Sequence, residues 1–243
     1  MDYIFGIRAV IEAIDAGKSI DKVLIRKDLG GDLARELLAK IRQFDILTQR
    51  VPQERLNRIT SKNHQGVIAQ ISPVTYHRLD HLLPALYEDG ANPFLLVLDG
   101  LTDIRNFGAI ARTADCSGVN GIVIPKRNSV SVTADAVKTS AGALFYIPVC
   151  RENDLVAAVR FLKDSGIKVV AATEKASTLY TDCDFSVPTA VVMGSEDVGI
   201  SDEVLRLCDE LVAIPMQGNI GSLNVSVAAG VMMYEVVRQR GNL

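Results

Sequence analysis

The chain lacks the residues and runs that several classes of protein need. Its four cysteines, Cys116, Cys150, Cys183 and Cys208, are widely spaced and form no Cys-x-x-Cys pair, so we predict no zinc or other metal site and no disulfide framework. No apolar run approaches the roughly 18 residues that a membrane helix requires. Residues 1–5 have neither the basic start nor the cleavage site of a signal peptide. We therefore expect a cytoplasmic protein with reduced thiols and no membrane partner.

A large excess of either charge is also missing. The net charge is −3, from 26 Lys+Arg and 29 Asp+Glu, whereas proteins that bind nucleic acids usually carry a basic surface. The charges are unevenly distributed, however. Residues 1–80 carry 13 Lys+Arg and 10 Asp+Glu, a net charge of +3, and residues 81–243 carry 13 and 19, a net charge of −6. A basic N-terminal region that contacts RNA would explain this difference, and so would an ordinary solvated surface.

A polar stretch with three prolines, between about Ser72 and Pro93, divides the chain. We predict a first domain at residues 1–72, a linker at 73–92 with a short helix around 81–87, and a second domain at 93–243. In the first domain, helical and strand patterns alternate as in a small α/β/α sandwich. Its predicted helices are 7–16 and 32–44, and its predicted strands are 22–26 and 66–71.

The second domain alternates nearly continuous apolar runs with helical patterns. Such runs are typical of strands in a parallel sheet that is covered on both faces. Their alternation with helices predicts an α/β fold with crossover helices. The predicted strands are 94–98, 121–124, 168–172, 189–193 and 211–214, and the predicted helices are 108–117, 154–165, 201–208 and 224–240.

Three turn-rich polar segments each follow one of these strands directly: residues 99–114, 193–200 and 214–226. Ligands of open α/β sheets bind beyond the carboxyl ends of the strands, and glycines in such segments allow the backbone to approach a ligand closely. Together the segments offer the carboxylate of Glu196, the guanidinium of Arg112 and several side-chain amides. We therefore predict a ligand site at this edge of the sheet.

Each of these polar side chains also has an ordinary structural explanation. Asn106 is suited to cap the helix that follows it, and Ser222 and Asn224 are suited to cap the last helix. Arg112 could be a surface charge, and Glu196 could be a capping carboxylate at a helix N-terminus. The recurrence of polar, glycine-rich segments at three strand ends of one sheet favours the ligand site.

The three segments resemble the motifs of the SpoU (TrmH-like) branch of the SPOUT methyltransferases. The motifs read Asn-x-Gly-x-x-x-Arg, then Gly-x-Glu-x-x-Gly, then Ile-Pro-Met followed by Ser-Leu-Asn-Val-Ser. The three occur here in this order. The matching residues are Asn106, Gly108 and Arg112, then Gly194, Glu196 and Gly199, then residues 214–216 and 222–226.

The N-terminal region resembles the RNA-recognition domain of RlmB-type ribosomal RNA methyltransferases, a domain similar to ribosomal protein L30e. Residues 3–10 (YIFGIRAV) and 63–67 (NHQGV) carry this resemblance. Two departures from the family's pattern lie in the loops of the predicted site. The family often has Asp-Pro-x-Asn at residues 103–106, where this chain reads DIRN, and it usually has Gly at the position of Asp197.

The resemblance implies that S-adenosylmethionine is the cofactor and that a ribose 2′-hydroxyl of RNA is methylated, at a guanosine of 23S ribosomal RNA. It also implies a trefoil knot in the second domain, a rare exception to the usual chain connections, and a homodimer whose active site is completed across the interface. The implied residues are, for catalysis, Asn106, Arg112, Glu196, Ser222 and Asn224; for cofactor binding, Gly194, Ile214, Met216, Ser222 and Leu223; and for RNA binding, Arg8, His64 and Gln65.

Two of these roles stay open. The family's proposed base is the arginine at position 112, yet a guanidinium stays protonated in proteins and is better suited to hold a phosphate by two hydrogen bonds. A lone histidine is seldom catalytic, so we expect His64 either to contact RNA or to support its loop.

Three alternative functions remain at this point. The sheet pattern would suit a nucleotide-dependent oxidoreductase, although no Gly-x-Gly-x-x-Gly follows an early strand. An RNA-binding protein that has lost catalysis is a second alternative, against which the retained motif residues speak. Transfer RNA is the alternative substrate, and the complete N-terminal domain favours ribosomal RNA.

Overall fold

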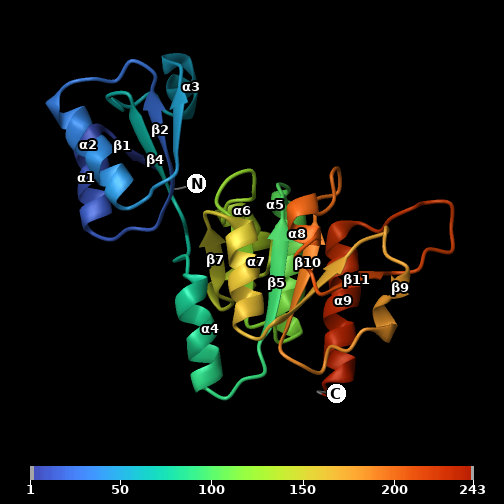
Figure 1. Ribbon diagram of the computed structural model, residues 1–243. Coiled ribbons are helices and arrows are strands. Elements are labelled where there is room, and N and C mark those ends of the chain that lie inside the picture. Colours follow the sequence, from blue (N-terminus) through green and yellow to red (C-terminus); the bar gives the residue numbers. More distant parts are fainter. Residues whose placement is uncertain (1–2, 242–243) are drawn as a thin grey trace. The chain divides into compact units, whose positions relative to one another are not determined.

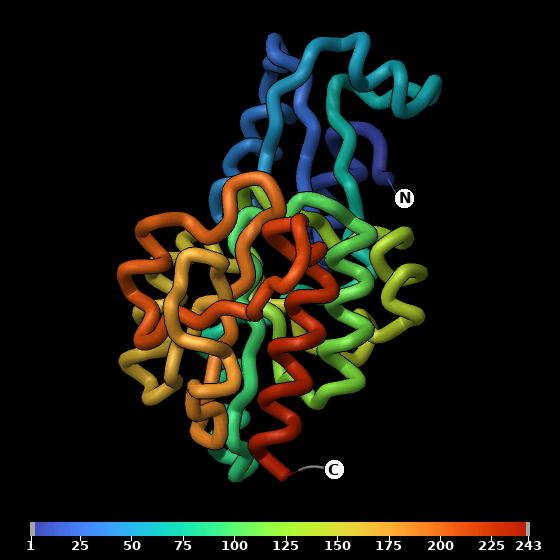
Figure 2. The backbone as a smooth tube through the Cα atoms, turned by 90° about the vertical axis from the view of Figure 1, so that its right-hand side faces the viewer, coloured from blue at the N-terminus to red at the C-terminus, as the bar shows by residue number. Residues whose placement is uncertain are grey.

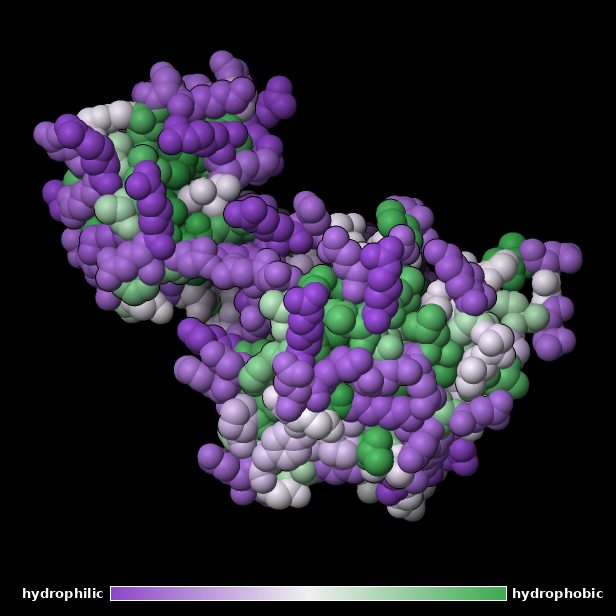
Figure 3. All heavy atoms as spheres, in the orientation of Figure 1, coloured by the Kyte–Doolittle hydropathy of each residue, from purple (hydrophilic) through white to green (hydrophobic). Residues whose placement is uncertain are grey.

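The structure is a computed structural model that describes residues 3–241. The chain divides into two compact units (Figure 1): the first comprises the residues up to Thr75 together with Ser131–Ala134, and the second comprises Tyr76–Val130 and the residues from Asp135 onward. No helix within residues 3–241 is long and apolar enough to cross a membrane. Hydrophilic side chains cover much of the face drawn in Figure 3, with hydrophobic patches between them on both units.

The first unit is a four-stranded mixed sheet with the strand order β1-β4-β2-β3. Alternate residues of a strand point to opposite faces, so Val23 and Ile25 pack under α1 and α2, while Leu24 packs with Leu56 of α3 on the other face. The elements are β1 (Tyr3–Phe5), α1 (Ile7–Asp15), β2 (Ile20–Arg26), α2 (Asp32–Gln43), β3 (Thr48–Val51), α3 (Gln53–Ile59) and β4 (Val67–Ile71).

The second unit is built on a seven-stranded sheet with the order β7-β6-β5-β10-β8-β11-β9, in which every pair of neighbours is parallel. This confirms the predicted α/β fold with a parallel sheet. The elements are α4 (Leu79–Glu88), β5 (Phe94–Asp99), α5 (Ile104–Cys116), β6 (Gly121–Pro125), α6 (Ala134–Thr139), η1 (Ala143–Phe145), β7 (Val149–Glu152), α7 (Leu155–Asp164), β8 (Lys168–Ala172), β9 (Thr178–Leu179), η2 (Tyr180–Asp182), β10 (Thr189–Gly194), α8 (Asp202–Leu205), β11 (Glu210–Ala213) and α9 (Val225–Gln239).

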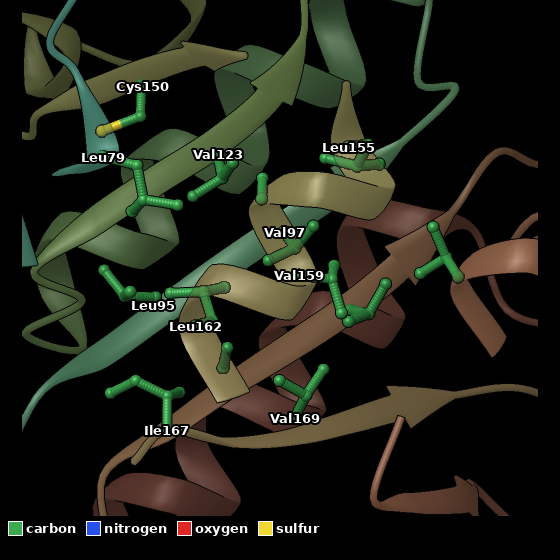
Figure 4. Close-up of a cluster of buried hydrophobic side chains, with 14 of the residues drawn as sticks. Leu79, Leu95, Val97, Val123, Cys150, Leu155, Val159, Leu162, Ile167 and Val169 are labelled. Atoms are coloured by element: carbon green, nitrogen blue, oxygen red, sulfur yellow. The ribbon is translucent and has the colours of Figure 1, made fainter. Parts of the chain in front are cut away.

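Helices cover both faces of this sheet. On one face, α7 directs Leu155, Val159 and Leu162 onto strand residues that include Val97 and Val169, as Figure 4 shows. On the other face, α5 and α9 lie side by side (Figure 2). Apolar residues spaced three or four apart form the inward faces of these two helices, and they are fully buried. They are Phe107, Ile110, Ala111 and Ala114 of α5 and Ala229, Met232, Met233 and Val236 of α9.

The segment 73–92, which we predicted as a linker, contains a helix that belongs to the core of the second unit. Leu79 and Leu83 of α4 are buried beside α7, and the N–H of Leu79 donates to the carboxylate of Glu152 at 3.1 Å. The helix predicted around 81–87 is therefore present as Leu79–Glu88, with Pro84 inside it, but it is part of the second unit's core and not of a linker.

The boundaries of several elements differ from the prediction. The helix α5 begins at Ile104, four residues before the expected start at Gly108, and α8 covers only Asp202–Leu205 of the predicted 201–208. Eight elements of two to seven residues within residues 3–241 were not predicted, because short segments carry little periodicity. They are β1, β3, α3, α6, η1, β7, β9 and η2.

Candidate active site

Side chains from all three motif segments meet in one hydrogen-bonded cluster at the carboxyl ends of β5 and β10. The amide of Asn106 donates to Glu196 Oε1 at 3.0 Å. The amide of Asn224 donates to the same oxygen at 2.6 Å and to Asn106 Oδ1 at 3.1 Å. The N–H of Val225 also points to this carboxylate, at 3.4 Å. The cluster therefore fixes a carboxylate and two amides that are far apart in the sequence.

The local structure of the first segment leaves the Asn106 side chain free for this cluster. Asp103, not Asn106, is the N-cap of α5, since its carboxylate accepts from the N–H of Asn106 at 2.7 Å. The capping explanation considered for Asn106 is therefore wrong. Asn106 itself lies in the first turn of the helix. As the N-cap, the carboxylate of Asp103 also lies at the positive end of the helix dipole.

The capping explanation for Asn224 is correct, and the residue serves two purposes at once. Its Oδ1 accepts from the N–H of Ser226 at 2.9 Å, which caps α9, while its amide nitrogen belongs to the cluster. Because one side chain fixes the start of α9 and holds Glu196, the orientation of the cluster depends on where this helix begins.

A tight loop holds Glu196 in place. Main-chain bonds join Ser195 and Gly199 in both directions, at 3.2 and 2.9 Å. Only glycine fits at position 194, since a Cβ there would lie 2.2 Å from the carbonyl carbon of Gly199. Gly199 itself has φ +76°, a conformation that L side chains rarely adopt. The glycines of the second motif are thus required by the shape of the loop.

The glycine of the first motif has a packing role. A Cβ at Gly108 would lie 2.6 Å from Thr139 Cβ and 2.9 Å from the carbonyl oxygen of Ala136. The helices α5 and α6 therefore approach each other too closely for any other residue at this position.

Next to the cluster lies a pocket of about 560 Å³, within the range of small-molecule sites. Every residue that we assigned to the cofactor lines it. So do Glu196 and Asn224 of the cluster, together with Thr173 and Glu174, which the sequence analysis did not single out. The assigned cofactor residues are Gly194, Ile214, Met216, Ser222 and Leu223.

Thr173 and Glu174 follow β8, which is hydrogen-bonded to both β10 and β11. The signal that could have found them is therefore their place directly after a predicted strand. We missed them because their segment contains no glycine and belongs to no motif.

Arg112 lies apart from the pocket in the single chain. It is exposed on α5, and no hydrogen bond or ion pair joins its side chain to another residue of the range 3–241. Ser222 lines the pocket without joining the hydrogen-bonded cluster. The structure of one chain thus assembles Asn106, Glu196 and Asn224 and leaves Arg112 on the surface.

The three residues predicted to bind RNA have different surroundings in the first unit. Arg8 is exposed on α1 and lies 3.8 Å from Glu36. His64 is only 5% exposed; the N–H of Gly66 donates to its Nδ1 at 3.0 Å, so Nε2 carries the ring proton and donates to Asn57 at 2.9 Å. His64 therefore supports its loop, the second of the two roles that we considered for it.

Gln65 is exposed and also has a structural role. Its φ is +51°, and its Oε1 accepts from the N–H of Ile7 at 3.1 Å, which satisfies a free donor at the start of α1. The loop 60–66 and the start of α1 are thus joined within the first unit.

Comparison with known proteins assigns both units to known families. Residues 93–234 match the SpoU rRNA methylase family, and residues 3–77 match the family of RNA 2′-O ribose methyltransferase substrate-binding domains. The chain belongs to the SpoU rRNA methylase family. It is accordingly an RNA methyltransferase that uses S-adenosylmethionine.

Relatives of this SpoU methylase extend over both units. A Bacillus subtilis protein assigned to the TrmH family of tRNA/rRNA methyltransferases, YacO, is 39% identical over 98% of this chain and 96% of its own. A Sinorhizobium meliloti rRNA methyltransferase, solved with bound S-adenosylmethionine, covers 97% of this chain and 86% of its own, with 28% identity and a TM-score of 0.62.

A third similar protein is the TrmH/SpoU tRNA modifying enzyme of A. aeolicus. It covers 68% of this chain and 85% of its own, with 29% identity and a TM-score of 0.57. About a third of the SpoU methylase described here therefore has no counterpart in that tRNA enzyme.

Proposed function

We propose that this methyltransferase methylates a ribose 2′-hydroxyl of RNA, at a guanosine of 23S ribosomal RNA, in the cytoplasm. The observation that carries the proposal is the Asn106–Glu196–Asn224 cluster at the edge of a pocket of cofactor size. A carboxylate held by two amides can accept a hydrogen bond from a hydroxyl and orient it for attack. Such orientation matters because a ribose hydroxyl is a weak nucleophile.

The residues around the pocket fit the cofactor. Ile214, Met216 and Leu223 offer an apolar slot for an adenine ring, and Gly194 brings the main chain to the pocket wall without a side chain. When bound there, S-adenosylmethionine supplies a methyl group on a positively charged sulfur. Glu196 would accept a hydrogen bond from the ribose hydroxyl of the RNA and so hold this hydroxyl opposite the methyl group.

Arg112 would act across the interface of a homodimer. Its exposure and lack of partners within residues 3–241 leave its guanidinium available to a second copy of the chain. The outer side of α9 supports such an interface, because two of its large hydrophobic side chains are exposed. Val227 and Tyr234, which lie two helical turns apart, are 52% and 49% exposed. In the partner's site, a fixed guanidinium would hold a phosphate of the RNA by two hydrogen bonds.

We also propose that the second unit contains the family's trefoil knot and that the first unit is an L30e-like RNA-recognition domain. The strand order supports the knot, since α9 follows β11, which lies next to the edge strand β9, and returns to pack on α5 and β10. The net positive charge of residues 1–80 supports the second assignment.

Ribosomal RNA is favoured over transfer RNA by how far the similarity extends. The S. meliloti rRNA enzyme covers 97% of this chain, whereas the A. aeolicus tRNA enzyme covers 68%. The similarity therefore favours an RNA substrate whose recognition requires both units. Mapping 2′-O-methyl groups in ribosomal and transfer RNA from a strain that lacks the protein would test the substrate, and an unmodified tRNA site in place of an rRNA site would contradict the proposal.

Replacing Arg112 tests the catalytic assignment. We expect Arg112→Ala to lower methyl transfer by about a hundredfold or more and to leave cofactor affinity unchanged. Stability should stay within about 0.5 kcal/mol, as for other exposed side chains. Arg112→Lys should remain impaired because it loses the planar fork. Single-turnover assays with saturating RNA measure this, with the exposed Arg206→Ala as control; turnover equal to wild type would make Arg112 a mere surface charge.

A fragment of residues 76–243 tests the roles of the two units. We expect it to fold and bind S-adenosylmethionine, because it retains the sheet, α4 and the pocket, and to lose most of its activity on ribosomal RNA. A fragment of residues 93–243 should be less stable by about 3 kcal/mol or more, since it lacks the buried Leu79 and Leu83. Full activity of the 76–243 fragment would contradict a role of the first unit in RNA recognition.

A further inference from the structure

Two carboxylates that line the pocket, Glu174 and Asp197, have no role in the cluster described above, and Glu174 is the one that follows a strand of the sheet directly. Glu174 lies two residues beyond the end of β8 and lines the pocket. Its side chain is exposed, and within residues 3–241 it makes no hydrogen bond or ion pair. A carboxylate has only acceptor atoms, so Glu174 is available to a ligand that brings hydrogen-bond donors into the pocket.

The main chain around Glu174 is held in a defined turn. The N–H of Thr173 donates to the carbonyl of Val212 in β11 at 2.9 Å, and the N–H groups of Lys175 and Ala176 donate to Thr173 Oγ1 and O, each at 3.3 Å. The first residue of the turn is therefore tied to the sheet and to both residues that follow Glu174. A side chain on such a turn is presented to the pocket from a fixed point of the backbone.

The strand order places Glu174 between the two chemically different ends of the pocket. The strands run in the order β5-β10-β8-β11. The polar cluster of Asn106 and Glu196 follows β5 and β10, and the apolar residues Ile214 and Met216 follow β11. Glu174 follows β8, the strand between them. In S-adenosylmethionine the ribose likewise lies between the reacting sulfur and the adenine.

We propose that the Glu174 carboxylate accepts hydrogen bonds from the ribose hydroxyls of the cofactor and thereby helps to position it. The inference rests on the proposed function, which assigns this pocket to S-adenosylmethionine. A vicinal diol offers two donors to the two oxygens of a carboxylate, and a carboxylate at a strand end performs this task in other nucleotide-binding α/β sheets. Glu174 is thus a specificity-determining residue for a ribose with both hydroxyls.

The test is calorimetric binding, which does not depend on RNA or on turnover. Wild type and Glu174→Gln are titrated with three ligands: S-adenosylmethionine, S-adenosylhomocysteine, and S-adenosylhomocysteine without its ribose 2′- and 3′-hydroxyls, the last in competition with unmodified S-adenosylhomocysteine. Glu88→Gln is the matched control, because it removes one exposed negative charge at a residue that does not line the pocket. Circular dichroism verifies that each variant is folded.

We expect Glu174→Gln to weaken the binding of S-adenosylmethionine and of S-adenosylhomocysteine by the same factor. This factor should be about tenfold to a hundredfold, as for the loss of hydrogen bonds to a charged group. The ligand without hydroxyls should bind both proteins equally, and Glu88→Gln should behave as wild type. A greater loss for S-adenosylmethionine would assign Glu174 to the charged sulfur, and an equal loss for the ligand without hydroxyls would assign it to the ammonium group. Either result, or unchanged binding of all ligands, overturns the inference.

Leu223→Arg separates this inference from the proposed function. It places a charge in the apolar slot, so it should abolish or severely weaken binding of both natural ligands if the pocket is the cofactor site. Unchanged binding by Leu223→Arg would refute the pocket itself. Weakened binding by Leu223→Arg with unchanged binding by Glu174→Gln would refute the role of Glu174 alone.

Discussion

Replacing Asn224 by aspartate separates the two tasks of this residue. The aspartate keeps an oxygen that accepts from the N–H of Ser226, so the cap of α9 is preserved. It loses the amide hydrogens that now reach Glu196 at 2.6 Å and Asn106 at 3.1 Å. A carboxylate then faces the carboxylate of Glu196. Asn224→Ala is the matched variant, because it removes the same donors without adding a charge.

The loss of stability caused by the aspartate depends on pH, and proton linkage gives the direction of this dependence. Two carboxylates in contact cannot both ionise freely, so one pKa of the pair in the folded variant rises above the ordinary range of a carboxyl. The folded state then binds more protons than the unfolded state, and stability falls as the pH rises through this window. Both side chains are exposed, so solvent screening limits the rise to about one pKa unit, which corresponds to about 1.4 kcal/mol.

Urea unfolding at one protein concentration measures the effect between pH 4 and pH 8. We expect the free energy of unfolding of Asn224→Asp, relative to that of Asn224→Ala, to fall by about 1 kcal/mol or more between pH 4 and pH 7. Above that range the difference between the two variants should be constant. Asn224→Ala itself should cost about 1 kcal/mol from its lost cap. Parallel pH profiles for the two variants would refute the direct contact between positions 224 and 196.

Two further predictions concern stability and thiol chemistry. Arg240 donates four hydrogen bonds of 2.7–3.3 Å to main-chain oxygens before β5 and β10, so Arg240→Ala should reduce the free energy of unfolding by about 2–4 kcal/mol. Arg206→Ala, at an exposed residue, should change it by under about 0.5 kcal/mol in the same urea titration, and equal effects would contradict the role of these bonds. Burial raises the pKa of Cys150 and Cys183 to about 12 and that of Cys208 to about 11, so at pH 8 the folded protein should react rapidly with Ellman's reagent only at exposed Cys116; rapid release of more than one equivalent would contradict this burial.

The ligand-binding edge of the sheet could be predicted because local sequence patterns determine it. Apolar runs such as 94–98 and 189–193 appear as β5 and β10 with nearly the same bounds. Parallel strands place their carboxyl ends at one edge, so polar segments that follow such strands must gather there. The meeting of Asn106, Glu196 and Asn224 follows from that rule, although their hydrogen bonds do not.

Contacts between distant segments could not be predicted, because no local pattern encodes them. The preference for Asp103 over Asn106 as the N-cap depends on where the chain leaves β5. The burial of His64 depends on Asn57 and Gly66 closing around its ring. The packing of α4 depends on apolar surface supplied by α7, some 80 residues later in the chain.

By itself, the sequence determined the fold class, the family and the cofactor, since strand patterns and motif residues are properties of short segments. Only the tertiary structure decided which residues share the pocket. Glu174 carries no motif and became a candidate solely because β8 lies between β10 and β11. Strand order arises from pairing between segments far apart in the chain, and the free energy of that pairing comes from burial over the whole sheet, not from any one stretch of residues.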